Sequence, residues 1–142
     1  MFSICSLIGN RQDSSGLIFS PDHLESMDVL NLGYQLASEL SHIDLNQPSL
    51  PMIADDIICG ILNNNIKISS DGAKYIAVEN IGILFEEQLC LNVAALFKSY
   101  SRSVFLIIIS SPTIIDHYYY PFKGNHNIKV NLSEVPYYIL HR

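Results

Sequence analysis

The sequence has few basic residues, and those it has are scattered. Eight Lys and Arg stand against 14 Asp and Glu, which gives a formal net charge of −6. The basic residues form no run or stripe that could neutralise a phosphate backbone. We therefore expect no autonomous binding to DNA or RNA.

Long apolar runs are also lacking, although the composition is apolar. Of the 142 residues, 49% are hydrophobic and only 15% are charged, and the mean hydropathy is +0.23. The longest unbroken apolar run, residues 104–109, has the length of a strand, whereas a spanning helix needs roughly 20 apolar residues. We expect no membrane segment. The surplus of apolar side chains indicates a fully covered sheet, a partner, or both.

Targeting, disulfide and metal motifs are missing as well. The N-terminus lacks a basic region and soon reaches Gly9, which is unlike a signal peptide. The three cysteines are odd in number and widely spaced, as expected of buried thiols in a reducing compartment. The five histidines show no His-x-x-x-His spacing, so no transition-metal site is indicated. We expect a cytoplasmic protein with a single domain over residues 1–142.

What the sequence does contain is a buried strand that ends on an acid. Residues 75–78 (Tyr-Ile-Ala-Val) are apolar without alternation, which favours a strand buried on both faces, and Glu79 and Asn80 follow directly. Open α/β sheets place ligands at the carboxyl ends of their strands, and a Walker B acid there faces Mg²⁺ or its water. Glu79 is therefore a candidate metal and catalytic residue, with Asn80 beside it. An ordinary strand ending in polar residues is the open alternative.

A second element of a phosphate site is expected near the N-terminus. Residues 2–8 (Phe-Ser-Ile-Cys-Ser-Leu-Ile) read as a central strand, and residues 9–16 follow as a polar loop bracketed by Gly9 and Gly16. Strand, glycine and polar loop are the context of a phosphate-binding loop, whose backbone N–H groups surround the anion. Candidate nucleotide-binding residues are Gly9, Arg11, Ser14, Ser15 and Gly16, together with Ser110 after the apolar strand 104–109.

The Walker A pattern itself fails in that loop. Counted from Gly9, it needs Gly at position 14, Lys at 15, and Ser or Thr at 16, but the chain has Ser14, Ser15 and Gly16. The ammonium for the phosphates and the hydroxyl for Mg²⁺ are both missing. Arg11 is no equivalent of that Lys, because its fork has a different geometry. A plain strand-to-helix turn is the simpler reading.

The order of expected elements predicts an α/β fold. Helical periodicity marks residues 53–62, which stop at three asparagines, and a helix from about residue 88 to 100 precedes the strand 104–109. Together with the strands this predicts a three-layer fold with a mainly parallel sheet of the P-loop NTPase (AAA+-like) type. Residues 2–8, 75–78 and 104–109 should be neighbouring parallel strands. The loop 9–16, Glu79 and Ser110 should then lie at one edge of the sheet.

A set of short motifs extends along the chain. They are residues 29–32 (Val-Leu-Asn-Leu) with Leu36 and Leu40, residues 75–85, Leu91 and Leu96, Ser101-Arg102-Ser103, the strand 104–109 and the Tyr-rich tail. In these motifs the sequence resembles the small P-loop proteins of BREX-type phage-defence gene clusters, the BrxF-like family. The resemblance implies a subunit of a phage-restriction assembly with other protein subunits, and a homo-oligomer remains open. The family's Gly-Lys-Thr is missing at Ser14-Ser15-Gly16, and Asn80 stands where related ATPases keep a glutamate base.

Three functional hypotheses remain open on the sequence alone. The first is a degenerate NTPase-like subunit that acts through protein contacts, with ATP and Mg²⁺ bound weakly and little or no hydrolysis. The second is a working ATPase in which Arg11 and backbone amides hold the phosphates. The third is an α/β interaction domain that binds no nucleotide. Ser15→Lys together with Gly16→Thr should restore some nucleotide affinity if the loop keeps its fold.

Overall fold

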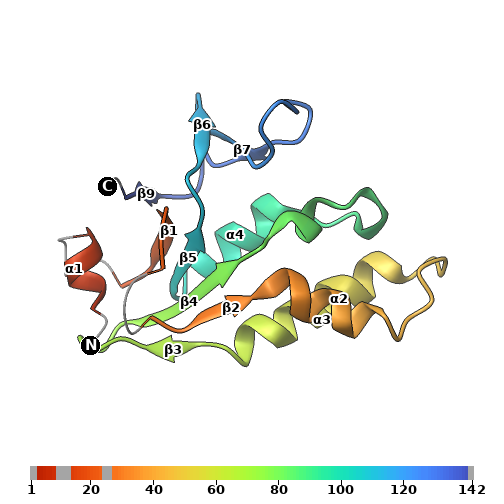
Figure 1. Ribbon diagram of the computed structural model, residues 1–142, viewed down its shortest axis with the longest axis horizontal. Helices are drawn as coiled ribbons and strands as arrows, with labels where there is room; N and C mark the ends of the chain where they lie inside the picture. The colour runs from red at the N-terminus through yellow and green to blue at the C-terminus, as the bar shows by residue number, and fades with distance from the viewer. Residues whose placement is uncertain (1–2, 9–13, 24–26, 141–142) are drawn as a thin grey trace.

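The computed structural model describes residues 3–8, 14–23 and 27–140. At its centre five strands run parallel: β1 (Gly16–Ser20), β2 (Val29–Asn31), β4 (Lys74–Glu79), β5 (Phe105–Ile109) and β9 (Tyr137–Ile139). Their order across the sheet is β2-β4-β5-β1-β9, and every neighbouring pair is parallel. A short strand, β3 (Lys67–Ile68), pairs antiparallel with the start of β4. The fold is thus α/β with a mainly parallel sheet (Figure 1).

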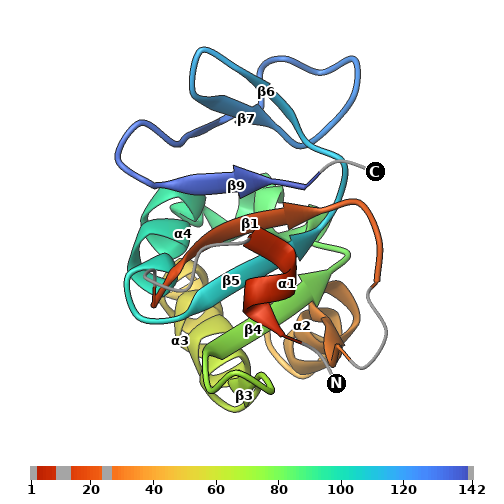
Figure 2. The same ribbon diagram turned by 90° about the vertical axis from the view of Figure 1, so that its left-hand side faces the viewer.

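Helices cover the two faces of this sheet unequally. Three of them, α2 (Leu32–Leu40), α3 (Leu50–Asn63) and α4 (Val93–Ser101), lie on one face, and the five-residue α1 (Ile4–Ile8) lies on the other (Figure 2). Two 3₁₀ turns, η1 (Gly82–Phe85) and η2 (Glu87–Leu89), connect β4 to α4. This layering is compatible with the expected three-layer fold. Within the described residues, no helix combines the length and the apolar character needed to cross a membrane.

Successive residues of the buried strands belong to different cores. On the face of α2, α3 and α4 lie Leu17, Phe19, Ile76, Val78, Leu106 and Ile108, and on the face of α1 lie Ile18, Tyr75, Ala77, Phe105 and Ile107. Strand side chains alternate between faces, so a strand covered on both sides must be apolar at every position. The unbroken apolar runs therefore correctly predicted β4 and β5, which are parallel neighbours with Tyr75 opposite Phe105.

The C-terminal third adds a small antiparallel sheet beside the main one. Its strands are β6 (Thr113–Ile115), β7 (Tyr118–Tyr120) and β8 (Val130–Asn131), in that order. Tyr119 is buried, and its ring lies 4.9 Å from that of Phe19 in β1, measured between centroids. Val130 is buried as well and joins the larger core. The small sheet is thus held to the main sheet by side-chain packing.

The expected strand at residues 2–8 is wrong for the part that the structure describes. Residues Ile4–Ile8 form α1, and the first strand of the sheet is β1, which lies between β5 and β9. Ile4 is buried against the sheet, and its backbone N–H donates to Asp71 Oδ1 at 3.2 Å. A short apolar run fits a buried strand and a buried helical turn equally well, so periodicity could not separate the two.

Candidate functional site

The carboxyl ends of the parallel strands bring together polar residues from distant parts of the chain. Ser20 ends β1, Asn31 ends β2, Glu79 ends β4 and Ser110 follows β5. The backbone N–H of Ser110 donates to the carbonyl of Ser20 at 2.7 Å, and Asn31 lies opposite Glu79 in the register of β2 and β4. The expectation that Glu79 and Ser110 share one edge of the sheet is confirmed.

The predicted phosphate loop does not share that edge. Gly9 and Arg11 lie outside the described residues, but Ser14, Ser15 and Gly16 are described and lead into the start of β1. Gly16 pairs with Phe105, which in turn pairs with Tyr75, four residues before Glu79. Four residues of strand span about 13 Å. The described part of the loop therefore lies at the amino edge, and its expected position beside Glu79 is wrong because β1 follows the loop instead of preceding it.

The segment that does follow β1 reaches Glu79 directly. Ser20 is buried, and its hydroxyl donates to the carbonyl of Asp22 at 2.8 Å, which turns the chain at the end of the strand. His23 then places its Nε2 2.7 Å from Glu79 Oε2. Their side chains are 54% and 33% exposed, so this is a surface contact. The acid that ends β4 is therefore engaged by an imidazole.

Asn80 has a structural task at this edge. Its φ of 58° lies in the left-handed region, which Asn tolerates better than most residues. Its amide donates to Asn31 Oδ1 at 3.0 Å, and the same oxygen accepts the backbone N–H of Tyr34 as the N-cap of α2. A Cβ built on Gly33 would lie 2.5 Å from both the amide nitrogen and the backbone oxygen of Asn80. Only glycine allows this close approach, so Asn80 fixes the start of α2 to the tip of β4.

Ser110 likewise bonds within the protein. Its side chain is hydrogen-bonded to the hydroxyl of Tyr119 in β7. Burial raises the pKa of the Tyr119 hydroxyl, and the bond to Ser110 acts in the opposite direction with a smaller effect. Ser110, a candidate nucleotide-binding residue on the sequence, therefore joins the main sheet to the small one.

The carboxyl edge shows no built cation site in the described residues. No three His, Cys, Asp or Glu side chains of that part of the chain gather closely enough to hold a metal ion. Glu79 is the acid that a Mg²⁺ ion would use, and the chain offers it His23 as a neighbour. A carboxylate beside an imidazole can exchange a proton or form an ion pair. As a Mg²⁺ ligand it would supply a carboxylate oxygen, and water or substrate phosphates would have to complete the octahedral shell.

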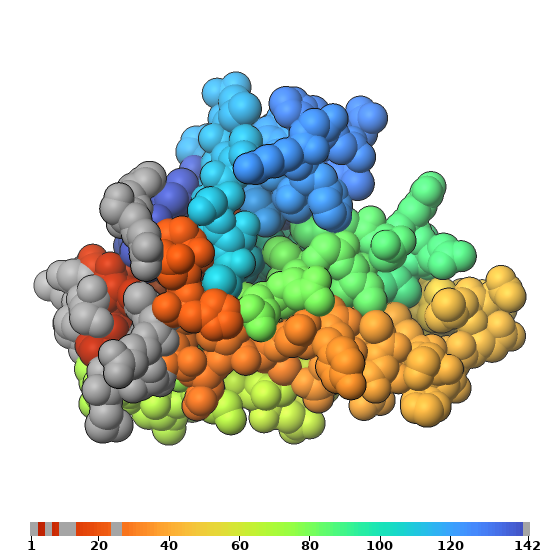
Figure 3. Space-filling model, in the orientation of Figure 1, coloured from red at the N-terminus to blue at the C-terminus, as the bar shows by residue number. Residues whose placement is uncertain are grey.

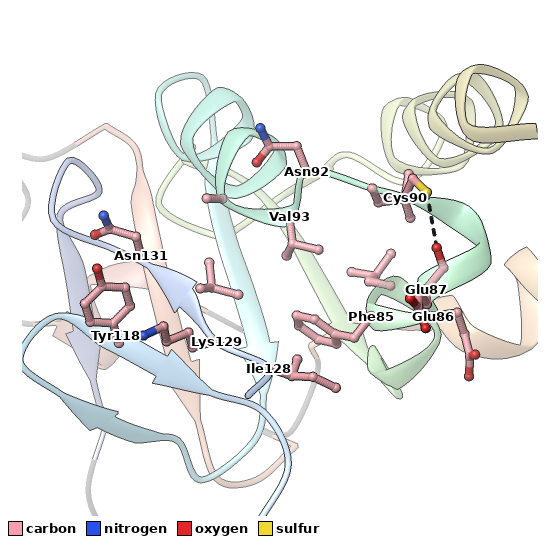
Figure 4. Close-up of a pocket in the computed structure, with 14 residues that line it drawn as sticks. Phe85, Glu86, Glu87, Cys90, Asn92, Val93, Tyr118, Ile128, Lys129 and Asn131 are labelled. Atoms are coloured by element: carbon pink, nitrogen blue, oxygen red, sulfur yellow. Dashed lines mark hydrogen bonds between the residues drawn. The ribbon is translucent and has the colours of Figure 1, made fainter. Parts of the chain in front are cut away.

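A second concave region lies away from this edge. A groove of about 700 Å³ runs between the η1–η2 segment, the start of α4 and the strands β7 and β8. Figure 4 shows Glu86 and Glu87 at one end and Lys129 at the other, with Phe85 and Ile128 between them. Lys129 Nζ lies 4.6 Å from the centroid of the Tyr118 ring. The groove is apolar along its length and carries opposite charges at its ends.

Sequence reasoning missed both His23 and this groove. His23 stands 56 positions before Glu79, so only the parallel pairing of the strands reveals the contact. In the Tyr-rich segment, Tyr118 lines the groove, and Tyr119 belongs to the larger core. Comparison with protein-family models, with curated proteins and with solved structures finds no match to this chain.

Proposed function

We propose that this chain is a degenerate P-loop NTPase-like subunit of a BREX-type phage-defence assembly, which acts through protein contacts without hydrolysing ATP. One observation carries the proposal. Where a phosphate-binding loop would follow the first parallel strand, a short acidic segment follows β1 instead and places His23 on Glu79 at 2.7 Å.

The order of the strands supports the P-loop part of the proposal. Numbered along the chain, the five parallel strands β1, β2, β4, β5 and β9 lie in the order 5-1-4-3-2. That order is the one expected for P-loop NTPases of the AAA+ type, the fold implied by the resemblance to BrxF-like proteins. In such a sheet the strands numbered 1 and 3 carry the phosphate loop and the Walker B acid at their carboxyl ends. Here those strands are β1 and β4, and β4 ends on Glu79.

The length and composition of the linker after β1 are unsuited to phosphate binding. Only eight residues, 21–28, separate β1 from β2, too few for a phosphate loop followed by a helix of several turns. The linker contains no Gly, Lys or Arg, and it contains Asp22, Glu25 and Asp28. A phosphate cradle needs free backbone N–H groups and positive charge. Three acids in a sequence of eight residues disfavour the binding of a nucleoside triphosphate.

Magnitudes favour this function over a working ATPase. A hydrogen bond to a charged group contributes about 1.5–3 kcal/mol, so losing the Walker A Lys alone weakens nucleotide binding roughly tenfold or more. Phosphoryl transfer draws most of its catalysis from positioned charge, and an amide such as Asn80 cannot act as a base. The atypical loop of the ATPase hypothesis would also have to work from the amino edge, where Ser14, Ser15 and Gly16 lie.

Two measurements on the full chain test the proposal. In a phosphate-release assay with MgATP we expect no turnover above background, both for the unmodified chain and for Glu79→Gln. Turnover that Glu79→Gln abolishes, and that Asp116→Asn leaves intact as a charge-matched control, would promote the ATPase hypothesis. Coexpression with the subunits of a BREX-type assembly should yield a stable complex that contains this chain. If the chain always elutes alone, the proposed role in a defence assembly is wrong, and the hypothesis of an α/β interaction domain that binds no nucleotide is favoured.

A further inference from the structure

A second groove lies at the end of the molecule where α2 meets the η1–η2 segment. It encloses about 300 Å³, and its apolar wall is made by Ala37, Leu40, Leu45, Ile83 and Leu89. In Figure 3 the loop after α2, in orange to yellow, and the η1–η2 segment, in green, form the right-hand end of the molecule. We call this the α2–η2 groove.

Leu45 is held at the rim of the α2–η2 groove by its own turn. Asp44 Oδ1 accepts the backbone N–H of Asn46 at 2.9 Å, and the carbonyl of Asp44 accepts the side-chain amide of Gln47 at 3.1 Å. This fixed turn leaves Leu45 45% exposed. An aliphatic side chain held in water by a rigid turn gives up little conformational entropy when another molecule covers it.

The charge around the α2–η2 groove has one sign. No Lys or Arg occurs at positions 29–66 or 75–97, the stretches that form α2, α3, η1, η2 and the loops between them. The same elements carry six exposed carboxylates, namely Glu39, Asp44, Asp55, Asp56, Glu86 and Glu87. Glu86 itself lines the groove. A cationic partner would be attracted to this end of the molecule, and an anionic one repelled.

We propose that the α2–η2 groove binds a cationic amphipathic helix of a partner protein. Aliphatic side chains of that helix would contact Leu45 and Ile83, and Lys or Arg beside them would face Glu86. A helix fits better than a strand, because the walls of the groove are formed by α2 and η2, which are helical and offer no strand edge for pairing. A second copy of this chain fits poorly, because its net charge of −6 opposes a like-charged surface. The proposal names the contact surface of the proposed function and rests on it.

The probe is a synthetic 18-residue helical peptide with Leu on one face and Lys on the other. The full chain, labelled with ¹⁵N, is titrated with this peptide and its amide resonances are followed. We expect saturable shifts confined to the walls of the α2–η2 groove and binding that weakens with added salt. A peptide of the same composition with the Leu residues scattered around the helix, and one with Glu in place of Lys, should both bind at least tenfold more weakly.

Matched variants separate groove binding from general attraction. Leu45→Ala should weaken binding by roughly tenfold, as for an interface anchor, whereas Ile115→Ala, which truncates an equally exposed side chain on β6, should not. Glu86→Gln should weaken it by about threefold, and Asp116→Asn, the same loss of charge far from the groove, should leave it unchanged. Neither Leu45 nor Glu86 belongs to the buried core, so these variants should fold.

The outcomes decide the proposal either way. Shifts spread evenly over the surface, equal binding of the scattered peptide, or no binding would overturn it. A concentration-dependent dimer that protects the α2–η2 groove from the peptide would also overturn it in favour of self-association. Nucleotide turnover combined with groove binding would refute the proposed function and leave this surface standing. If the peptide does not bind and no nucleotide turnover is seen, the groove proposal is refuted and the proposed function stands.

Discussion

The two edges of the central sheet look alike in sequence and differ in structure. At the amino edge, Ser14, Ser15 and Gly16 belong to a polar, glycine-bracketed stretch that resembles a phosphate loop. At the carboxyl edge, Ser20, Glu79 and Asn80 lie where such a loop would have to act. Glu79 and Asn80 bond to distant parts of the chain, and the Ser20 hydroxyl donates to Asp22 in the turn that follows β1. A polar loop is a candidate site only at the edge where strands end, because ligands of open α/β sheets bind there.

The largest effect should come from breaking the close approach at the carboxyl edge. Gly33→Ala places a Cβ 2.5 Å from two atoms of Asn80, one of them backbone, so α2 or the tip of β4 must shift. We expect a loss of about 2–3 kcal/mol in the free energy of unfolding, measured by urea denaturation. Gly60→Ala is the matched control, because nothing lies within 4 Å of its added Cβ. As a helical Gly-to-Ala change it should stabilise the protein by about 0.5–1 kcal/mol.

A smaller loss is expected at Asn80. Asn80→Ala removes the hydrogen bond to Asn31 and puts alanine, which tolerates the left-handed region less well than Asn, at this position. We expect the free energy of unfolding to fall by about 2 kcal/mol. Asn80→Gly loses the same bond but adopts that backbone freely, so it should recover about half of the loss. Denaturation of both variants measures the two contributions. Equal stability of the Ala and Gly variants would show that the backbone conformation is not under strain.

The burial of Tyr119 predicts a dependence on alkaline pH. Burial raises the pKa of Tyr119 above its usual value near 10, so the folded state holds this proton more tightly than the unfolded one. The resulting stabilisation is full below about pH 10 and is lost as the pH rises through the folded pKa. Tyr119→Phe should flatten the fall of thermal stability above pH 10. Tyr34→Phe, at a tyrosine 73% exposed, should not.

The smallest effect is expected at the amino edge. Ser15→Lys with Gly16→Thr supplies the Lys and Thr of the Walker A ending, with Ser14 still in place of its Gly. The added ammonium lies about 13 Å of strand away from the level of Glu79. We expect no gain in affinity for MgATP by calorimetry. A gain of tenfold or more would show that the loop at residues 9–16 binds phosphate without Glu79, and would remove the distinction between the two edges.

Local pattern predicted two buried strands and one amphipathic helix. β4 and β5 were evident as unbroken apolar runs, and the four-residue spacing of Ile53, Ile57 and Ile61 predicted α3. β1 was missed because only Leu17, Ile18 and Phe19 are apolar, a run too short to stand out from a loop leading into a helix. The start of α4 at Val93 was placed about five residues too early, because η2 continues the helical spacing before it.

The candidate site was predictable only in part. Glu79 and Ser110 were placed at one edge because each follows a recognisable strand, and parallel strands end together. The contact between Glu79 and His23 was not predicted, because His23 follows β1, the strand that the sequence did not reveal. The role of Asn80 could not be read from sequence either, since the left-handed φ and the approach of Gly33 arise only when α2 packs on β4.

The central claim is that the segment after β1 does not bind the phosphates of a nucleotide. The most direct test is a calorimetric titration of the full chain with MgATP, carried out in parallel on the His23→Ala variant. The unmodified chain should give no saturable heat, because the segment after β1 offers Asp22 and His23 where a nucleotide needs glycines and a lysine. His23→Ala should also give none, since freeing Glu79 does not create a phosphate cradle. Saturable binding to the unmodified chain, reduced by Glu79→Gln, would contradict the central claim.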